Sequence, residues 1–235
     1  MTVETQSIYA VVPAAGVGKR MASTIPKQYL ELLGKPIIVH TLEALLRVER
    51  IQKIIVMVSE HDEFWQTLDV FNDPRIEVAI GGAERSISVL NGLLHLQSEL
   101  EKTDWVMVHD VVRPCIQAST INAFIDNLID DSVGGLLAIP IADTIKRVDI
   151  TGIVEETVDR ESLWRAQTPQ MFHFQQLFDA LVKGIKDDET ITDEASAIEL
   201  AGYSVKVVEG LRSNLKVTQA EDLALADFFL SLGDQ

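Results

Sequence analysis

The chain has 235 residues, of which 47% are hydrophobic and 24% charged, a composition typical of a soluble globular protein that buries a substantial core. Its formal net charge of −16 argues against non-specific binding to nucleic acids or to anionic membranes. A site for a phosphorylated substrate must therefore be a local basic pocket on an acidic body.

A loop of small residues follows the first predicted strand. Residues 8–12 are apolar and partly β-branched, and Pro13 is expected to end the strand because proline cannot donate to a sheet ladder. The next residues have almost no side chains, so a ligand can approach the main-chain N–H groups closely, and cations follow directly. We interpret this segment as a phosphate-binding loop made of Pro13, Ala14, Ala15, Gly16, Gly18, Lys19, Arg20 and, shortly afterwards, Lys27.

Two better-known phosphate loops do not fit this segment. A P-loop needs Ser or Thr after its Gly-Lys pair, whereas Arg20 follows Lys19 here. The dinucleotide-binding fingerprint needs a third glycine, and Met21 occupies that position. Spacing alone leaves one alternative open, an ordinary tight turn between a strand and a helix with two solvated cations.

Predicted helices alternate with predicted strands along the chain. The helices span residues 36–46, 84–97, 121–129, 174–183 and 194–200, and the further strands span 53–58, 76–80, 104–110, 134–140 and 205–208. In the second helix Ile87, Leu90 and Leu94 lie on one face. The alternation predicts right-handed crossovers and an α/β fold with a mostly parallel central sheet.

The carboxyl ends of parallel strands gather on one rim of a sheet, where ligands bind. Gly16, Gly82 and Asp110 each follow a predicted strand and should lie on that rim. With Arg113 close behind it, Asp110 can hold magnesium or orient a substrate hydroxyl, and a local cap in which the two side chains pair is an equal alternative. His109 has no nearby nucleophile to activate, so we interpret it as structural.

The alternation of strands and helices breaks between residues 141 and 163. Two runs with polar residues at alternate positions, 143–148 and 153–158, are joined by a turn that contains a glycine. This pattern predicts a β-hairpin arm, at about 141–163, that projects from the body. No linker or repeat divides the chain, so we predict a single domain over residues 1–235 that carries this arm.

The single cysteine, Cys115, excludes an internal disulfide and fits a reducing compartment. It lies beside a proline, and spacing indicates no partner for it, so we expect a packing role rather than a nucleophile. No apolar run reaches membrane-spanning length, and residues 1–6 are typical of neither a signal peptide nor a transit peptide. We therefore expect a cytoplasmic protein without a membrane partner.

Several short motifs together resemble one enzyme family. Pro13-Ala14-Ala15-Gly16-x-Gly18-x-Arg20-Met21 is followed by Pro26-Lys27-Gln28-Tyr29, and His109-Asp110-x-x-Arg113-Pro114 comes later. Blocks at 81–88, 143–146, 158–160, 167–170, 190–195 and 214–218 complete the series, so the likeness covers nearly the whole chain. In these motifs the chain resembles the cytidylyltransferases of isoprenoid synthesis, although Ala83 and Val111 depart from the residues usual in that family.

This resemblance implies a Rossmann-like nucleotidyltransferase fold with a mostly parallel central sheet and a projecting β-hairpin arm. It implies an enzyme that joins CTP to methylerythritol phosphate, releases pyrophosphate and requires Mg²⁺ or another divalent metal. It also implies a homodimer whose hairpin arms interlock. The chemistry would be an in-line attack on the α-phosphorus of CTP, which needs positioning and charge neutralisation rather than a covalent nucleophile.

The resemblance further assigns roles to individual residues. The catalytic residues that surround the α-phosphate and the leaving group would be Arg20, Lys27 and Lys216. The nucleotide would be bound by Pro13, Ala14, Ala15, Gly16, Gly18 and Lys19, and its base by Gly82, Ala83 and Ser88. Methylerythritol phosphate would be bound by Asp110, Arg113, Thr144, Arg160, Thr168 and Thr192, with Asp110 also the metal ligand.

Three other functions compete with this one. A ribitol-5-phosphate cytidylyltransferase shares the loop and the scaffold and differs in the polyol pocket. A nucleotide-binding protein without catalytic activity is disfavoured by the intact Lys27, Asp110 and Lys216. A nicotinamide oxidoreductase is disfavoured by Met21 in place of the third glycine.

Overall fold

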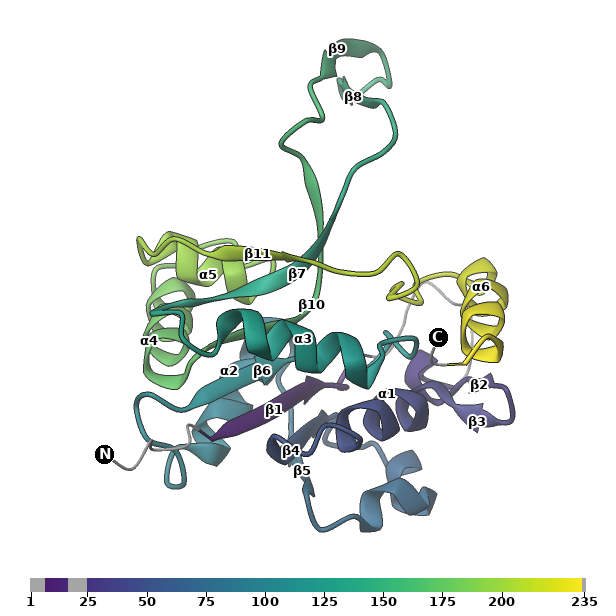
Figure 1. Ribbon diagram of the computed structural model, residues 1–235, viewed down its shortest axis with the longest axis vertical. Coiled ribbons are helices and arrows are strands. Elements are labelled where there is room, and N and C mark those ends of the chain that lie inside the picture. Colours follow the sequence, from purple (N-terminus) through teal and green to yellow (C-terminus); the bar gives the residue numbers. More distant parts are fainter. Residues whose placement is uncertain (1–6, 17–24, 234–235) are drawn as a thin grey trace.

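One seven-stranded sheet organises the computed structural model, which describes residues 7–16 and 25–233 (Figure 1). The strand order is β11-β7-β10-β6-β1-β4-β5. The strands are β1 (Ile8–Pro13), β4 (Ile51–Val58), β5 (Ile76–Ile80), β6 (Trp105–Val108), β7 (Gly134–Pro140), β10 (Trp164–His173) and β11 (Lys206–Glu209). Neighbouring strands are parallel except where β10 runs antiparallel to β6 and β7. The predicted α/β fold with a mostly parallel sheet is confirmed.

Helices cover both faces of the sheet, and a separate hydrophobic core lies on each face. The first face carries α1 (Ile37–Leu46), α3 (Ala118–Leu128) and part of α6 (Ala220–Ser231), and the second carries α2 (Arg85–Leu96), α4 (Phe174–Lys186) and α5 (Glu194–Leu200). Adjacent residues of β1 show the division, because Ala10 and Val12 belong to the first core and Val11 to the second. Helices on both faces leave the strand ends as the accessible part of the sheet.

Strand β10 is an element that the sequence analysis did not predict. Its middle contains polar residues and Pro169, which the β-strand pattern does not favour. The pairing of β10 with β7 shifts register between Ala166 and Gln170, so the proline lies where the ladder is interrupted. Beyond the interruption, Met171 and Phe172 are fully buried. The strand is therefore held by burial of its second half, between two strands of the opposite direction.

The face of α2 that carries Ile87, Leu90 and Leu94 is not the face that packs most deeply on the sheet. The buried residues of this helix are Ser88, Val89, Gly92, Leu93 and Leu96, whereas Leu94 is 48% exposed and Ile87 and Leu90 are only partly buried. Gly92 explains the difference, because a Cβ atom there would lie 2.7 Å from a methyl group of Val11. The helix approaches the sheet most closely at this glycine, and the face that contains Gly92 is therefore the one that packs.

The predicted hairpin arm is present and extends away from the body between the ends of β7 and β10 (Figure 1). It consists of β8 (Ile145–Val148) and β9 (Val154–Val158), which pair only with each other. At the turn, the Asp149 carboxylate accepts hydrogen bonds from the N–H groups of Thr151 and Ile153 at 2.8 and 2.9 Å. Gly152 has a φ of +86°, the left-handed region that favours glycine. The local sequence thus closes the hairpin.

The smaller elements lie around the body. They are β2 (Glu31–Leu32), β3 (Lys35–Pro36) and the short 3₁₀ helices η1 (Lys27–Tyr29), η2 (Phe64–Thr67) and η3 (Asp69–Asn72). Of the helices that the structure describes, none is both long and apolar enough to cross a membrane.

Candidate active site

A cavity of about 170 Å³ opens at the rim where β1, β5 and β6 end. It brings together Gly16, Gly82 and Asp110, as the parallel sheet predicts. Of the residues assigned from the sequence, ten line it: Pro13, Ala14, Ala15, Gly16, Lys27, Gly82, Ala83, Ser88, Asp110 and Lys216. Gly18, Lys19 and Arg20 lie outside the described residues.

The loop after β1 is tied to the turn that carries Lys27. The N–H group of Ala14 donates to the Met57 carbonyl oxygen at 2.8 Å, which continues the pairing of β1 with β4. The side chain of Gln28, 2% exposed, donates to the Ala14 carbonyl oxygen at 2.7 Å. Because Gln28 follows Lys27 directly, this bond fixes where the lysine enters the cavity. Gln28 belongs to the Pro26-Lys27-Gln28-Tyr29 motif, but the motif alone indicates no role for it.

A second glycine-containing loop, residues 81–84, also lines the cavity. The Ser88 hydroxyl accepts a hydrogen bond from the Gly82 N–H group at 2.9 Å and donates one to the Glu84 carbonyl oxygen at 3.0 Å. A Cβ atom on Gly81 would lie 2.8 Å from the Cβ atom of Ala15, so the two loops approach each other closely. Ser88 is 2% exposed and holds the main chain of Gly82 in place.

Asp110 lies among several cations. One carboxylate oxygen is 2.8 Å from the Lys216 ammonium, and the other accepts a hydrogen bond from Arg85 Nε at 2.9 Å. Arg113 Nε lies 3.7 Å away, beyond hydrogen-bond length. Burial alone would raise the pKa of Asp110, but the charges of Arg85, Lys216 and Arg113 outweigh it and hold the pKa well below its usual range. Asp110 is therefore a fully ionised carboxylate in the cavity wall.

Arg85 and Glu194 form an ion pair that the sequence analysis missed. Both terminal nitrogens of Arg85 donate to the two Glu194 oxygens, at 2.6 and 2.9 Å. Glu194 is 1% exposed, and burial raises the pKa of its carboxyl against the lowering effect of the Arg85 charge. A capping box made by Asp193 and Ser196 starts α5 and so fixes the position of Glu194. Only the fold brings this pair together, because 109 positions separate its members.

Thr168 lies behind Asp110 and holds its main chain. Its hydroxyl accepts a hydrogen bond from the Asp110 N–H group at 3.0 Å and lies 3.1 Å from His109 Nδ1. His109 is fully buried, and this burial lowers its pKa to about 4, so the ring is neutral at pH 7. These contacts agree with the structural role predicted for His109. Arg113, 8% exposed, donates to the Asn214 carbonyl oxygen at 2.8 Å and supports the loop that carries Lys216.

Five of the six residues assigned to substrate binding are not in the cavity lining: Arg113 and Thr168, described above, and Thr144, Arg160 and Thr192. Thr144 and Arg160 are exposed at the foot of the arm, where Arg160 donates to the Ala142 carbonyl oxygen. Thr192 is exposed just before α5, and its N–H group donates to the Ser196 hydroxyl at 3.0 Å. The structure therefore brings the nucleotide residues together but leaves the arm residues apart from them.

The described part of the chain contains neither a cluster of potential metal ligands nor an exposed thiol. Residues 7–16 and 25–233 contain no group of three or more His, Cys, Asp or Glu side chains that could hold a metal ion. Cys115 is 5% exposed, and burial raises the pKa of its thiol to about 12, which disfavours the thiolate and fits the packing role expected for it.

The chain is similar to known proteins along nearly its whole length. The family model for 2-C-methyl-D-erythritol 4-phosphate cytidylyltransferase matches residues 8–232. Proteins of that name from Haemophilus influenzae (strain 86-028NP) and Vibrio vulnificus (strain YJ016) are 50% and 48% identical to it. The alignments cover 97% of this chain and 98% of the first protein, and 96% of this chain and 95% of the second. The crystal structure of the Francisella tularensis protein of that name superposes with a TM-score of 0.83 at 35% identity, over 95% of this chain and 99% of that one.

Proposed function

The chain belongs to the 2-C-methyl-D-erythritol 4-phosphate cytidylyltransferase family, and we propose that the cavity at the ends of β1, β5 and β6 is its active site. It is a nucleotidyltransferase that joins CTP to 2-C-methyl-D-erythritol 4-phosphate in non-mevalonate isoprenoid biosynthesis, giving 4-diphosphocytidyl-2-C-methyl-D-erythritol and pyrophosphate. The relatives do not favour ribitol phosphate as the substrate, an inactive nucleotide-binding protein or an oxidoreductase.

One observation carries the assignment of the site to this cavity. On a chain of net charge −16, Lys27 and Lys216 line the same small cavity as the first loop. This is the local basic pocket that binding of a polyanion by an acidic protein requires. A phosphate oxygen of the polyol phosphate attacks the α-phosphorus of CTP in line with the departing pyrophosphate.

Lys27 and Lys216 neutralise the charge that develops on the α-phosphate and on the leaving group. A cation about 4 Å from a phosphate charge contributes roughly 4 kcal/mol at an effective dielectric near 20. Arg20, outside the described residues, is expected to assist them. The ion pair between Lys216 and Asp110, at 2.8 Å, supports this role because it holds the ammonium at the cavity wall before substrate arrives.

The cytosine base is read by the main chain of Gly82 and Ala83 and by Ser88. Support comes from the hydrogen bond between the Ser88 hydroxyl and the Gly82 N–H group, which fixes the polar groups of this loop. Fixed donors and acceptors discriminate between bases because a mismatched base leaves buried polar groups unpaired.

Magnesium is the metal that this site fits. Asp110 would hold it, since its ionised carboxylate faces the cavity, and the carboxylates of the described lining are only Glu84 and Asp110. Such a sparse set suits Mg²⁺, which keeps several waters and takes its other ligands from substrate phosphates. When bound, the ion neutralises phosphate charge and orients the pyrophosphate leaving group. Arg85 meanwhile stays on the other side of the Asp110 carboxylate.

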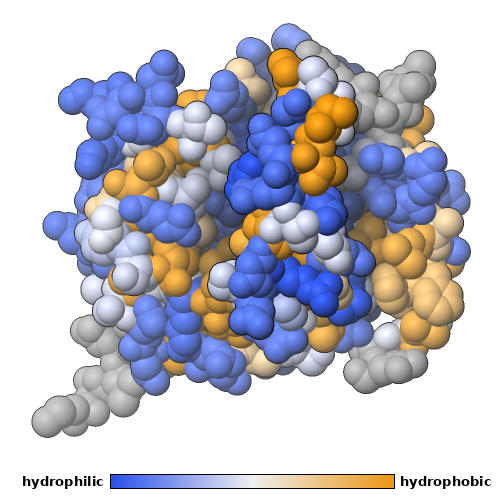
Figure 2. All heavy atoms as spheres, turned by 90° about the horizontal axis from the view of Figure 1, so that it is seen from above, coloured by the Kyte–Doolittle hydropathy of each residue, from blue (hydrophilic) through white to orange (hydrophobic). Residues whose placement is uncertain are grey.

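The protein forms a homodimer through the arm, which delivers Thr144 and Arg160 to the cavity of the other subunit. Ile150, Ile153 and Val154 are 103%, 65% and 54% exposed, an unusual amount of apolar surface for a small hairpin. Figure 2 looks down on the arm and shows hydrophobic residues among its hydrophilic ones. A second copy of the chain would cover them.

The reducing compartment that Cys115 fits also supports a cytoplasmic location.

A coupled pyrophosphate assay tests the proposal. The purified protein is supplied with CTP and Mg²⁺ and with either 2-C-methyl-D-erythritol 4-phosphate or ribitol 5-phosphate. We expect pyrophosphate release with the first polyol phosphate and far less with the second. Equal rates with both, or release only with ribitol 5-phosphate, would contradict the assignment of the substrate.

A further inference from the structure

Four charged side chains of alternating sign form a continuous chain of contacts beside the cavity. Glu194 contacts Arg85, Arg85 contacts Asp110, and Asp110 contacts Lys216. They come from the start of α5, the start of α2, the end of β6 and the loop after β11. The side chain of Glu194 is 1% exposed and that of Lys216 is 39% exposed, so this row of ion pairs runs from the interior to the substrate cavity.

We propose that Arg85 is a positioning residue for methylerythritol phosphate, because Glu194 fixes its guanidinium and the guanidinium in turn holds the Asp110 carboxylate. This inference rests on the proposed function of the cavity. All three guanidinium nitrogens of Arg85 donate hydrogen bonds to carboxylates. Two bind Glu194 as a fork, and Nε binds Asp110 at 2.9 Å. A guanidinium that is clamped through both terminal nitrogens in this way presents its Nε–H group in one direction.

Asp110 needs such a fixed partner because its other partner is expected to leave it. Lys216 binds one Asp110 oxygen at 2.8 Å, but its proposed role is to neutralise phosphate charge. Arg113 lies too far away for a hydrogen bond, and Thr168 holds only the main-chain N–H group of Asp110. When Lys216 turns to the substrate, Arg85 remains as the side chain of the described residues that keeps the carboxylate aimed.

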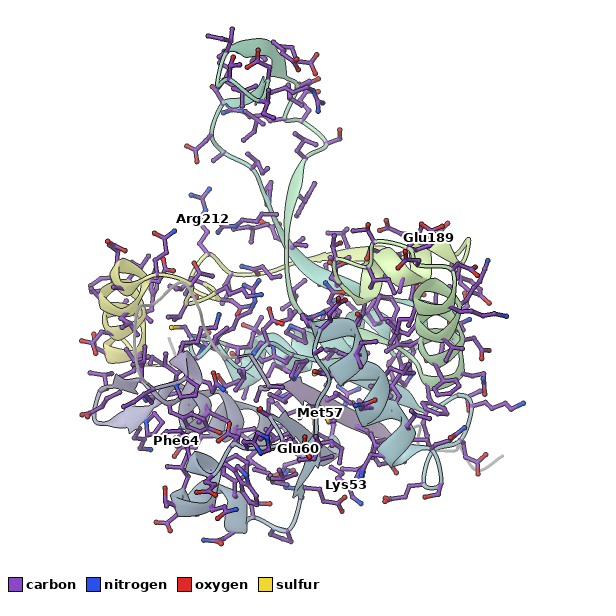
Figure 3. The ribbon with its side chains drawn as sticks, turned by 180° about the vertical axis from the view of Figure 1, so that it is seen from behind. Lys53, Met57, Glu60, Phe64, Glu189 and Arg212 are labelled. Atoms are coloured by element: carbon purple, nitrogen blue, oxygen red, sulfur yellow. The ribbon has the colours of Figure 1, made fainter. Side chains whose placement is uncertain are left out.

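A second cation bridges two carboxylates elsewhere and offers a matched control. Lys53 binds Glu77 and Glu99, each at 2.7 Å. Lys53 lies near the amino end of β4, whereas the cavity is at the carboxyl ends of the strands. Figure 3 labels Lys53 in the lower part of the body. Loss of this bridge removes the same kind of contact without reaching the cavity.

The experiment measures KM for each substrate, kcat and thermal unfolding in four proteins: wild type, Arg85→Lys, the double variant Arg85→Gln/Glu194→Gln, and Lys53→Gln. The double variant removes both charges of the buried pair together and leaves an amide pair, so it should lose less stability than a variant that removes one of the two charges alone. We expect its KM for methylerythritol phosphate to rise about tenfold or more, because the Asp110 carboxylate is no longer held in one orientation. Its KM for CTP should stay nearly unchanged.

Arg85→Lys keeps the positive charge opposite Glu194. It therefore tests the proposal even if the two glutamines of the double variant disturb folding. One ammonium cannot bind Glu194 as a fork and Asp110 at the same time, so the same selective rise in KM is expected. Lys53→Gln should leave both KM values unchanged. The proposal is overturned if the Arg85 variants have normal KM for methylerythritol phosphate, or if both KM values rise equally. Lack of activity in the wild-type protein would instead contradict the proposed function.

Discussion

The cavity and the arm both hold charged side chains in place, but through different kinds of contact. In the cavity, Arg85 binds Glu194 across 109 sequence positions, and the pair lies inside the body. In the arm, Arg147 binds Glu156 across nine positions, and both side chains are more than half exposed. The shortest distance is 2.6 Å in each pair.

Burial makes these two pairs different in energy. An exposed ion pair contributes about 0 to 1 kcal/mol because water screens it, whereas breaking a buried pair costs about 3–5 kcal/mol because a charge is left without water or a partner. The body therefore fixes its cavity within one chain. The arm makes only local contacts and leaves apolar side chains exposed, so it is suited to be completed by another surface.

The sharpest test of the cavity is the removal of its cations. Lys27→Ala and Lys216→Ala should each lower kcat by roughly 10²-fold or more, the scale for losing a preorganised charge donor. Lys216→Ala also breaks the ion pair with the buried Asp110 and should lower the unfolding temperature modestly, but the protein should stay folded at the assay temperature. Steady-state kinetics and a thermal unfolding curve for each variant provide the measurement. A variant with near-normal kcat and only a modest change in KM would contradict the assignment.

The sequence predicted the parts of the cavity that depend on local pattern. Apolar β-branched runs predicted the parallel strands, and the rim where they end followed from the topology of such sheets. Gly16, Gly82 and Asp110 therefore came together as expected. The hairpin arm was likewise predictable, because its turn is closed by the side chain of Asp149 within the same segment.

Long-range pairing was not predictable in the same way. Strand β10 was missed because Thr168 and Pro169 interrupt its pattern, and its place depends on β6 and β7 on either side. The pairing of Arg85 with Glu194 has no local signal, since each lies at the start of a different helix. The buried face of α2 depended on how closely Gly92 approaches the sheet, which hydrophobicity alone does not encode.

Mixing two inactive proteins tests whether the arm serves another subunit. Lys27→Ala and Arg160→Ala are combined under conditions that allow subunits to exchange. In a mixed dimer, the subunit with Arg160→Ala keeps an intact nucleotide loop and receives an intact arm. Half the dimers are mixed, and each has one wild-type site, so roughly one quarter of wild-type activity should return for a two-fold dimer.

Differently tagged subunits provide the control for this experiment, because they report exchange independently of activity. If the arm served its own subunit, each site would keep one defect and no activity would return. Recovery with confirmed exchange would therefore sharpen the comparison: the body of one subunit supplies the nucleotide-binding residues, and the arm of the partner supplies the remaining substrate-binding residues.

Base selectivity tests how firmly the cavity loop is held. The wild-type protein should prefer CTP to UTP by a wide margin, because the wrong base leaves fixed polar groups unpaired. Ser88→Ala removes the hydroxyl that holds Gly82 at 2.9 Å. The selectivity of this variant is the kcat/KM for CTP divided by the kcat/KM for UTP. We expect this ratio to fall by a larger factor than the rate with CTP does. Equal use of CTP and UTP by the unmutated protein would refute the assignment of this loop to the base.

The smallest expected effect comes from the arm, through a pair of matched substitutions. Glu194→Gln and Glu156→Gln each remove the negative charge from an ion pair with arginine and keep nearly the same shape. Glu194→Gln should lower the free energy of unfolding by about 2 kcal/mol, somewhat less than for a fully buried pair because the Arg85 side chain is 27% exposed. Glu156→Gln should change it by less than about 0.5 kcal/mol, since water already screens that pair. Denaturant unfolding of both variants measures the difference. If the two losses were equal, burial would not be what separates the cavity from the arm, and a large loss from Glu156→Gln would mean that a partner subunit buries this side of the hairpin.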